Sequence, residues 1–336
     1  MKITADVVEA ALRTAWPGAQ LTAEPVPLTG GQWASMARLA VRGTPPGVPA
    51  DLVLRIAPHA AMGAKELAVQ RRLAEAGLAT PAIRLSGPAG EPFDGAWAIM
   101  DFIPGTPLLA GLDGLAAVRR LPWLMGHLPA QLADTMAALH RIDPGPVVEH
   151  VRQAAPSTAF TVDELLPHLA AAAQASRQPA LIAASNALTS RRPDQSGSVI
   201  CHGDLHPLNL IEHGGRLVVL DWTAAVLAPP GYDITATWLL LRHPPLPAPA
   251  PLRPAIAAAA RLLARGFVRR YRAANPQTET GPLDWYAGLH ALRILSELTS
   301  WQHEHDPRAR SHPWRLLAPA ARALLVRATG ITAPAL

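Results

Sequence analysis

The chain has a single cysteine, Cys201, among its 336 residues. One thiol excludes an internal disulfide and a metal site built from several cysteines. Because Cys201 lies in an apolar stretch, we interpret it as a small buried side chain rather than as a reactive thiol.

Lysine is also scarce, since only Lys2 and Lys65 occur, although the net charge is +5. The positive charge therefore comes almost entirely from arginine. These arginines are scattered among apolar helix residues and form no basic tract with interleaved aromatic side chains, which argues against nucleic-acid binding. A positive field would still attract an anionic nucleotide.

Long uninterrupted hydrophobic runs are absent too. The longest candidate, 223–241, contains Pro229, Pro230 and Asp233, so no membrane span is expected. Residues 3–16 have an amphipathic helix pattern with acidic side chains, unlike a secretory signal. We therefore expect a cytoplasmic protein.

The hydrophobic content and the length of the chain indicate a large globular protein. With 49% hydrophobic residues it can bury a sizeable core, and 336 residues are more than one core usually serves. Period-two apolar patterns predict strands in four segments: 21–28, 36–43, 51–57 and 97–103. A 3.6-residue period predicts a helix over 65–77, and the pattern becomes Ala- and Leu-rich and helical after 106.

The most informative segment is 199–222, VICHGDLHPLNLIEHGGRLVVLDW, which predicts a strand, a polar loop and a second strand. Asp204 is followed five residues later by Asn209, and the second strand ends at Asp221. Carboxylates and an amide beside short hydrophobic strands are costly unless they bind something. Phosphoryl transfer needs such a set, with one carboxylate to orient a hydroxyl and two further groups to hold Mg²⁺.

This segment resembles the aminoglycoside phosphotransferase and choline kinase superfamily, small-molecule kinases with a protein-kinase-like fold. The His-Gly-Asp motif that ends at Asp204 stands where protein kinases carry His-Arg-Asp, and Asp221-Trp222 stands where they carry the metal-binding Asp-Phe-Gly. The resemblance implies that Asp204 is the catalytic base and that Asn209 and Asp221 hold Mg²⁺.

The same resemblance implies the fold class and its boundaries. We expect an α+β, two-lobed protein-kinase-like fold. A small sheet-containing N-lobe at 1–100 would bind the nucleotide, a hinge would span 101–106, and a larger, mostly helical C-lobe at 107–336 would carry the catalytic loop and acceptor site. The proline-rich stretch 242–254 is interpreted as a stiff connector, with a substrate-side insertion as the alternative.

Three further residues are expected to support the catalytic loop. His202 would hydrogen-bond within it, and the lack of a second histidine at ligand spacing argues against a metal role. His206 lies inside the loop and either lines the site or supports the loop. Asp233 is interpreted as structural, either anchoring the loop or capping a helix.

Segment 28–39, LTGGQWASMARL, resembles the family's nucleotide loop. Gly30 and Gly31 would let the backbone approach phosphates, and Ser35 would contact their oxygens. An ordinary hairpin turn is the alternative. The backbone around Asp101 and Phe102 would bind the adenine edge of ATP, with GTP as an alternative donor.

Arg55 stands where the family usually carries a phosphate-binding lysine. Arginine can donate to phosphate bidentately, although its geometry differs from that of lysine. Glu66, on the following helix, is the candidate ion-pair partner, and a solvated helix face is the alternative. Lys65 is adjacent but is expected to point elsewhere.

The function implied is a Mg²⁺-dependent kinase that phosphorylates a hydroxyl of a small molecule such as an antibiotic or a sugar-like compound. A nucleotide-binding pseudokinase is the alternative. The arginine at position 55 gives it slight support, whereas the intact Asp204, Asn209 and Asp221 argue against it. After Asp221 the chain has six acids and thirteen arginines, too few acids for a strongly cationic aminoglycoside. The best candidates for acceptor contacts are Glu297, Glu304 and Asp306.

Overall fold

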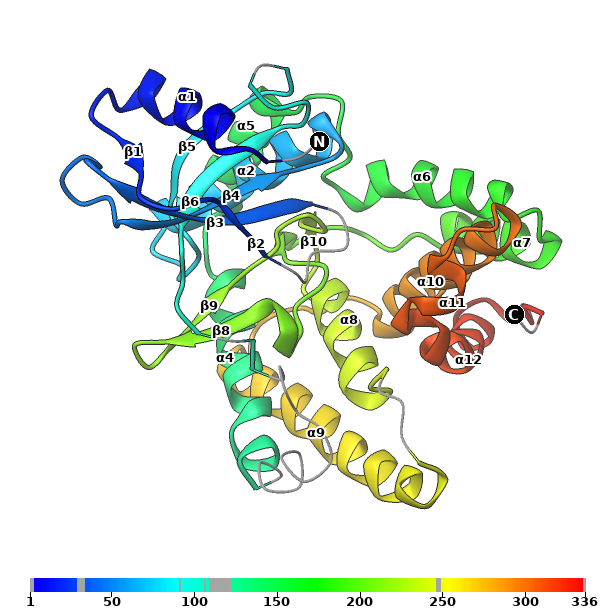
Figure 1. Cartoon of the computed structure of the whole chain (residues 1–336). Helices are drawn as coiled ribbons and strands as arrows, with labels where there is room; N and C mark the ends of the chain where they lie inside the picture. The colour runs from blue at the N-terminus through cyan, green and yellow to red at the C-terminus, as the bar shows by residue number, and fades with distance from the viewer. Residues whose placement is uncertain are drawn as a thin grey trace. The chain divides into compact units, whose positions relative to one another are not determined.

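The computed structural model describes residues 3–28, 34–90, 92–105, 107–108, 122–245 and 249–334 (Figure 1). Packing divides the chain into two units. We call the first the sheet unit; it comprises Met1–Ala110, Asp143–Thr158 and Leu208–Ala225. We call the second the helical unit; it comprises Gly111–Ile142, Ala159–Pro207 and Val226–Leu336.

The sheet unit is built on an antiparallel sheet. Its strands are β1 (Gln20–Leu21), β2 (Val26–Pro27), β3 (Ser35–Arg42), β4 (Asp51–Ile56), β5 (Ile83–Gly87) and β6 (Trp97–Asp101). Within the described residues the strand order is β1-β3-β4-β6-β5, and β2 pairs with β3. Its helices are α1 (Ala5–Ala15), α2 (Ala60–Glu75) and α5 (Pro144–Ala154).

The alternation of side chains along β4 sorts them between the two faces of the sheet. Leu52 and Leu54 are fully buried in a core that includes Leu12 of α1. Because successive strand residues point to opposite faces, Arg55 lies on the other face. Glu66 of α2 contacts it there.

A β-hairpin completes the sheet unit. Its strands, β8 (Leu210–His213) and β9 (Arg216–Val219), pair in antiparallel register. Gly214 and Gly215 form the two-residue turn, with φ of 58° and 74°. This left-handed backbone is the conformation that a tight hairpin requires and that glycine adopts without steric cost.

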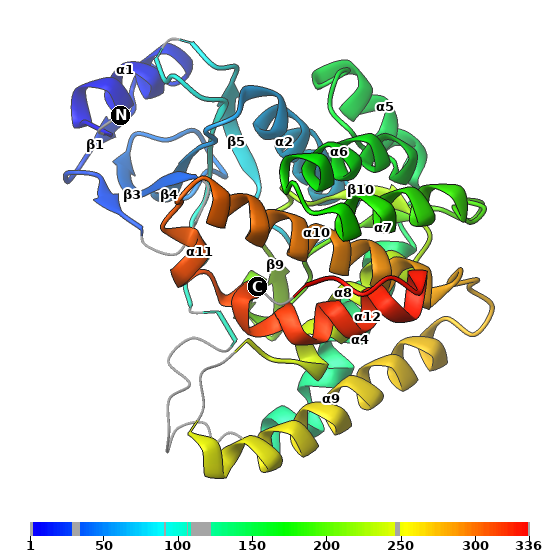
Figure 2. The same ribbon diagram turned by 90° about the vertical axis from the view of Figure 1, so that its right-hand side faces the viewer.

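The helical unit is organised around one long buried helix, α10. Its helices are α4 (Leu128–His140), α6 (Val162–Ala175), α7 (Pro179–Ser190), α8 (Gly231–Arg242), α9 (Arg253–Ala274), α10 (Leu283–His303), α11 (Arg308–Ser311) and α12 (Ala318–Thr329). Its short 3₁₀ turns are η2 (Ala250–Leu252) and η3 (Pro313–Leu317), and a third, η1 (Pro207–Asn209), spans the boundary with the sheet unit. Figure 2 shows α10 running beside α12, with which it makes extensive contact.

Two short strands of the helical unit flank the loop that carries Asp204. β7 (Val199–Cys201) precedes the loop and pairs antiparallel with β10 (Val226–Ala228). β10 leads directly into α8. The loop therefore leaves a strand that is fixed on one side by the segment that begins α8.

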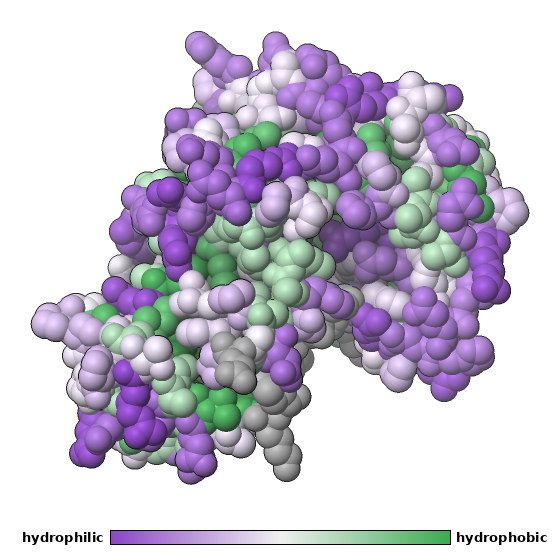
Figure 3. All heavy atoms as spheres, turned by 90° about the horizontal axis from the view of Figure 1, so that it is seen from above, coloured by the Kyte–Doolittle hydropathy of each residue, from purple (hydrophilic) through white to green (hydrophobic). Residues whose placement is uncertain are grey.

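The surface is typical of a folded globular protein. Hydrophilic side chains predominate on the face in Figure 3, and hydrophobic ones are interspersed. Large exposed hydrophobic residues are single and scattered, such as Val26, Leu262 and Leu316. No helix in the described part of the chain combines the length and the apolar composition that crossing a bilayer requires.

The predicted fold class is confirmed, because a small antiparallel sheet and a larger helical part are both present. The units are less contiguous than the sequence boundaries suggested. Residues 143–158 and 208–225 belong to the sheet unit, since α5 packs against α2 and Val219, the last residue of β9, donates from its N–H to the carbonyl of Ala79, shortly before β5.

Candidate active site

The loop that carries Asp204 is anchored by a carboxylate from the first turn of α8. Asp233 accepts hydrogen bonds from the backbone N–H of His202, at 2.8 Å, and from that of Gly203, at 2.6 Å. Gly203 has φ of 77°, so the turn needs a residue that tolerates left-handed backbone. This is the anchoring role that the sequence suggested for Asp233.

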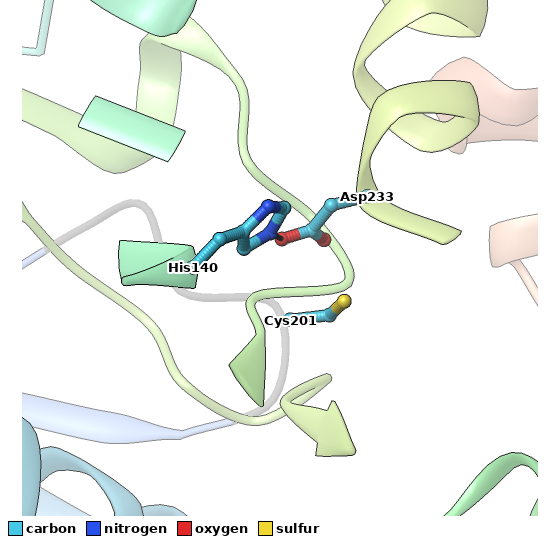
Figure 4. Close-up of side chains that lie close together, drawn as sticks. All are labelled: His140, Cys201 and Asp233. Carbon is cyan, nitrogen blue, oxygen red and sulfur yellow. Dashed lines mark hydrogen bonds and ion pairs between the residues drawn. The ribbon is translucent and has the colours of Figure 1, made fainter. Parts of the chain in front are cut away.

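The anchor is itself held by a buried hydrogen-bond chain. His140 of α4 contacts Asp233 through Nε2 at 3.1 Å and the hydroxyl of Tyr271 through Nδ1 at 2.7 Å. Figure 4 shows the His140 ring directed at the Asp233 carboxylate. Although burial opposes its charge, His140 and the loop N–H groups lower the pKa of Asp233 below its ordinary value.

His140, Cys201 and Asp233 also place three potential metal ligands within 4.8 Å of one another. Each of these donors is already engaged, since Cys201 Sγ lies 3.4 Å from the carbonyl of Ala228. Burial raises the pKa of Cys201 well above its ordinary value, as expected for a buried thiol that is not reactive. The cluster is therefore a structural support.

Other side chains hold the rest of the loop. Thr237, one turn after Asp233 on α8, donates its hydroxyl hydrogen to the carbonyl of Leu205 at 2.7 Å. His202 is fully buried, and its Nδ1 accepts from the N–H of Asp204 at 3.2 Å. Residues four apart on a helix share a face, so α8 supports both halves of the loop.

Asp204 remains partly open to solvent, with 47% of its side chain exposed. Its Oδ2 lies 3.3 Å from Nε2 of His206. Burial alone would raise the pKa of Asp204, but His206, His202 and Arg293 lower it below its ordinary value. The carboxylate is therefore ionised at neutral pH, as a hydrogen-bond acceptor for a hydroxyl must be.

One buried histidine near this anchor gives the protein a pH-dependent stability. Burial lowers the pKa of His290 to about 4, and its Nε2 bonds the carbonyl of Tyr232. The unfolded chain, with a histidine pKa of ~6.5, takes up the proton first as the pH falls. The free energy of unfolding should therefore lose about 2 kcal/mol between pH 7 and pH 5 from this residue.

Urea unfolding of His290→Gln at both pH values measures this contribution. The variant should lose less stability on acidification than the wild type, whatever its stability at pH 7. His213→Gln, at an exposed position in β8, is the matched control and should keep the wild-type pH dependence. An unchanged pH dependence in His290→Gln would contradict the assignment.

In the sheet unit, the β8–β9 hairpin brings the two metal-ligand candidates to its open end. Asn209 precedes β8 and Asp221 follows β9, and the N–H of Leu220 donates to the carbonyl of Asn209 at 2.9 Å. Asp221 has φ of 59° and its side chain is 40% exposed. A carboxylate and an amide oxygen are ligands that Mg²⁺ accepts.

A buried cation adjoins Asp221. Nη2 of Arg55 lies 2.8 Å from Oε1 of Glu66 and 3.6 Å from Oδ1 of Asp221. The side chains of Arg55 and Glu66 are 11% and 2% exposed, so the predicted ion pair is present and desolvated. Burial disfavours the charged guanidinium, but Glu66 and Asp221 outweigh it and raise the pKa of Arg55.

Arg55 also retains an unused donor. Its Nε is buried and makes no hydrogen bond within the described part of the chain. A buried donor without a partner is costly, and a phosphate oxygen would satisfy it. Ser35 lies nearby on β3, where its neighbour Met36 pairs with Arg55. Gly30 and Gly31 lie outside the described residues.

Lys65 has a role that the sequence did not suggest. It is buried, and its Nζ donates to the carbonyl of Ala225 at 3.1 Å. This bond ties α2 to the segment that follows Asp221. Trp222 is fully buried and donates from Nε1 to the hydroxyl oxygen of Thr80, so it packs within the sheet unit.

The proposed adenine contacts need revision in one respect. The N–H of Asp101 donates to the carbonyl of Ala82 at 3.0 Å, and that of Phe102 donates to the carbonyl of Asp51 at 3.2 Å. Both N–H groups are thus used within the sheet unit. The N–H of Ile103, next in the chain, has no backbone acceptor among the described residues.

A family model described as the phosphotransferase enzyme family matches residues 34–272, which is more than two thirds of the chain. The chain belongs to the phosphotransferase enzyme family. The prediction of a small-molecule kinase is confirmed at this level. No curated protein matches the sequence.

Solved structures share the fold of this phosphotransferase at low sequence identity. A protein of Ralstonia eutropha JMP134 assigned as an aminoglycoside phosphotransferase has a TM-score of 0.66, with 19% identity over 97% of each chain. Macrolide 2′-phosphotransferase MphH from Brachybacterium faecium has a TM-score of 0.55, with 18% identity over 94% of this chain and 97% of its own. A thermostable mutant of aminoglycoside phosphotransferase APH(4)-Ia, solved with ADP and hygromycin B, has a TM-score of 0.60, with 18% identity over 95% of this chain and 98% of its own.

The acidic residues that were candidate acceptor contacts in this phosphotransferase are largely neutralised. Glu297 accepts from Nε of Arg293 at 3.1 Å on α10. Asp306 accepts from Nε of Arg308 at 2.9 Å. Glu304 lies at the C-terminal end of α10. Two of the three candidates therefore already have a cationic partner.

Proposed function

We propose that the protein is a Mg²⁺-dependent kinase that transfers the γ-phosphate of ATP to a hydroxyl of a small molecule. The observation that carries the proposal is the arrangement at the open end of the β8–β9 hairpin, where Asp221 adjoins Arg55. Asp221 offers a carboxylate to a metal ion, and the adjacent Arg55 is desolvated and has an Nε–H without an acceptor among the described residues. Together these groups suit a bound triphosphate.

Asp204 is the proposed catalytic base. Its ionised carboxylate would accept a hydrogen bond from the acceptor hydroxyl, align the oxygen with the γ-phosphorus and take the proton as the bond to phosphorus forms. The lowered pKa makes it a weak base, so orientation of the hydroxyl contributes more than early proton removal.

The nucleotide phosphates are assigned to the sheet unit. Asn209 and Asp221 provide an amide and a carboxylate oxygen, a donor set that fits Mg²⁺. A bound Mg²⁺ would neutralise phosphate charge during the transfer. Arg55, held by Glu66, would donate to the remaining phosphate oxygens, and Gly30, Gly31 and Ser35 stay proposed as contacts. ATP is the proposed donor, with GTP as the alternative.

The proposed acceptor is a hydroxylated antibiotic or a sugar-like compound without strong positive charge. Polycationic acceptors need free carboxylates, whereas Glu297 and Asp306 are bonded to Arg293 and Arg308. The related APH(4)-Ia structure holds hygromycin B, so aminoglycosides are the natural comparison class. Glu304 remains the least engaged of the candidate acids.

Thermal unfolding with and without Mg-ATP, followed by ADP release with a panel of hydroxylated antibiotics, sugars and amino alcohols, tests the proposal. Stabilisation by Mg-ATP and ADP release with at least one uncharged acceptor are expected. Stabilisation without turnover on any acceptor would favour the pseudokinase. Efficient use of kanamycin-like compounds, with a KM near ~1 μM, would contradict the proposed acceptor class.

Replacement of Arg55 tests its role in phosphate binding. Arg55→Ala should raise the KM for ATP by about tenfold or more, because a charge-assisted hydrogen bond is lost. Arg55→Lys should keep substantial activity, since lysine also binds phosphate. Steady-state kinetics with varied ATP measure both effects.

Glu66, the buried ion-pair partner of Arg55, also affects the stability of these variants and provides a control. Arg55→Ala leaves Glu66 buried and unpaired, which costs about 3–5 kcal/mol of stability. Arg55→Ala combined with Glu66→Gln removes the stranded charge and should restore much of the stability without restoring ATP affinity. Unchanged ATP kinetics in a folded Arg55→Ala variant would mean that another cation holds the phosphates.

A further inference from the structure

The helical unit contains a cavity of about 450 Å³. Its described lining comes from Pro245, which follows α8, and from the second half of α10, α11, η3 and the start of α12. Figure 2 shows α10, α11 and α12 close to one another. The volume is within the range of pockets that bind small molecules.

The lining of this cavity is basic and apolar. It includes Arg310, Arg315 and His312, together with aliphatic residues such as Leu298 and Leu316. No acid is among its described lining residues. Arg315 donates from Nη1 to the carbonyl of Arg310 at 2.8 Å, which fixes one guanidinium against the backbone of the other residue.

A stack of aromatic and cationic groups connects the cavity wall with the surroundings of Asp204. The His312 ring lies 4.9 Å from that of Trp301 and 5.0 Å from that of Trp314. Arg293, whose charge acts on Asp204, lies over the Trp314 ring at 5.3 Å. The cavity lining thus leads, through His312 and Trp314, to Arg293, the cation whose charge acts on Asp204.

We infer that the cavity binds the part of the acceptor remote from the reacting hydroxyl, and that this part is apolar and carries a carboxylate or a similar anionic oxygen group. This inference rests on the proposed kinase function. Arg310 and Arg315 would supply charge-assisted hydrogen bonds to the anion, while Leu298 and Leu316 would cover the apolar body. A cationic group would meet like charge with no carboxylate in the described lining to offset it.

A matched series of ligands tests this preference: ω-hydroxydecanoate, the corresponding diol and the corresponding amino alcohol. The three compounds share the hydroxyl and the chain length and differ in the charge at the far end. Titration calorimetry on the full chain without nucleotide should give binding of the hydroxy acid that is about tenfold or more tighter than that of the amino alcohol.

Two double variants with the same change in net charge test whether Arg310 and Arg315 cause the preference for the hydroxy acid. Arg310→Gln with Arg315→Gln should remove the preference for the hydroxy acid, with an unchanged melting temperature as the check on folding. Arg261→Gln with Arg265→Gln, two exposed positions on α9, changes the net charge equally and should keep the preference. Equal binding of the three compounds, or a preference insensitive to the Arg310 and Arg315 changes, overturns the inference.

Turnover separates this inference from the proposed function. Selective binding of the hydroxy acid without ADP release from it or from any acceptor in the panel would support the cavity's ligand class and count against the kinase function. ADP release that is equal for the three compounds would support the kinase function and overturn the inference about the cavity.

Discussion

Asp204→Asn is expected to lower kcat by ~10²–10⁴-fold while leaving the affinity for Mg-ATP almost unchanged. Asparagine keeps the size of the side chain but cannot accept the proton of the acceptor hydroxyl. The loop should retain its shape, because Asp233 and Thr237 hold its backbone independently of the Asp204 carboxylate. Turnover assays combined with titration calorimetry of Mg-ATP measure the two quantities.

A surface variant controls for the loss of one negative charge. Asp134→Asn removes an exposed carboxylate on α4 that pairs with Arg270 at the surface, and such pairs contribute little. It should leave kcat within about twofold of the wild-type value. A large loss of Mg-ATP affinity in Asp204→Asn would instead assign Asp204 to the metal.

Asp221→Ala is expected to reduce turnover by ~10³-fold or more and to abolish the Mg²⁺ dependence of nucleotide binding. A phosphate-bound Mg²⁺ relies on one or two protein carboxylates, and the metal contributes several kcal/mol of charge stabilisation. Calorimetric titration with ATP in the presence of Mg²⁺ and in the presence of a chelator measures the metal dependence.

A second variant of Asp221 is needed because the backbone there is left-handed. Asp221 has φ of 59°, and alanine in left-handed conformation costs about 1–2 kcal/mol. Asp221→Asn tolerates the backbone and removes only the charge, so it should lose turnover with less loss of stability. Glu212→Ala, in the same hairpin, is the control. If both Asp221 variants keep Mg-ATP binding and Asp204→Asn loses it, Asp204 is the metal ligand and Asp221 the catalytic base.

The regular elements of the fold were predictable where local pattern and packing agree. The alternating residues of β4 and the helix at 5–15 follow their sequence periods. β5 was missed, because a register shift between Ile83 and Leu85 breaks the alternation on this strand. α2 begins at Ala60, five residues before the predicted start. The first turn was missed because Gly63 lowers the helix propensity there. A side chain at Gly63 would approach Ala57 to 2.6 Å, so packing requires the glycine.

The candidate site was predictable where its residues lie within one short segment. Asp204, Asn209 and Asp221 fall in a single strand–loop–strand pattern, and the Arg55–Glu66 pair follows from a strand and the next helix. The supports from Thr237, His140 and Tyr271 were missed, because contacts across 32 to 131 residues leave no local pattern. The engaged N–H groups of Asp101 and Phe102 depend on strand pairing that sequence alone did not give.

The hydrogen-bond chain that ends on the catalytic loop has a consequence for synthesis of the protein. The last residue in that chain, Tyr271, leaves the ribosome well after the loop itself, and α9 must pack on α4 before His140 is fixed. The sheet unit, in contrast, is complete in sequence at Ala225. We therefore expect the loop that carries Asp204 to become ordered only after α9 has been synthesised, when the sequence of the sheet unit is already complete.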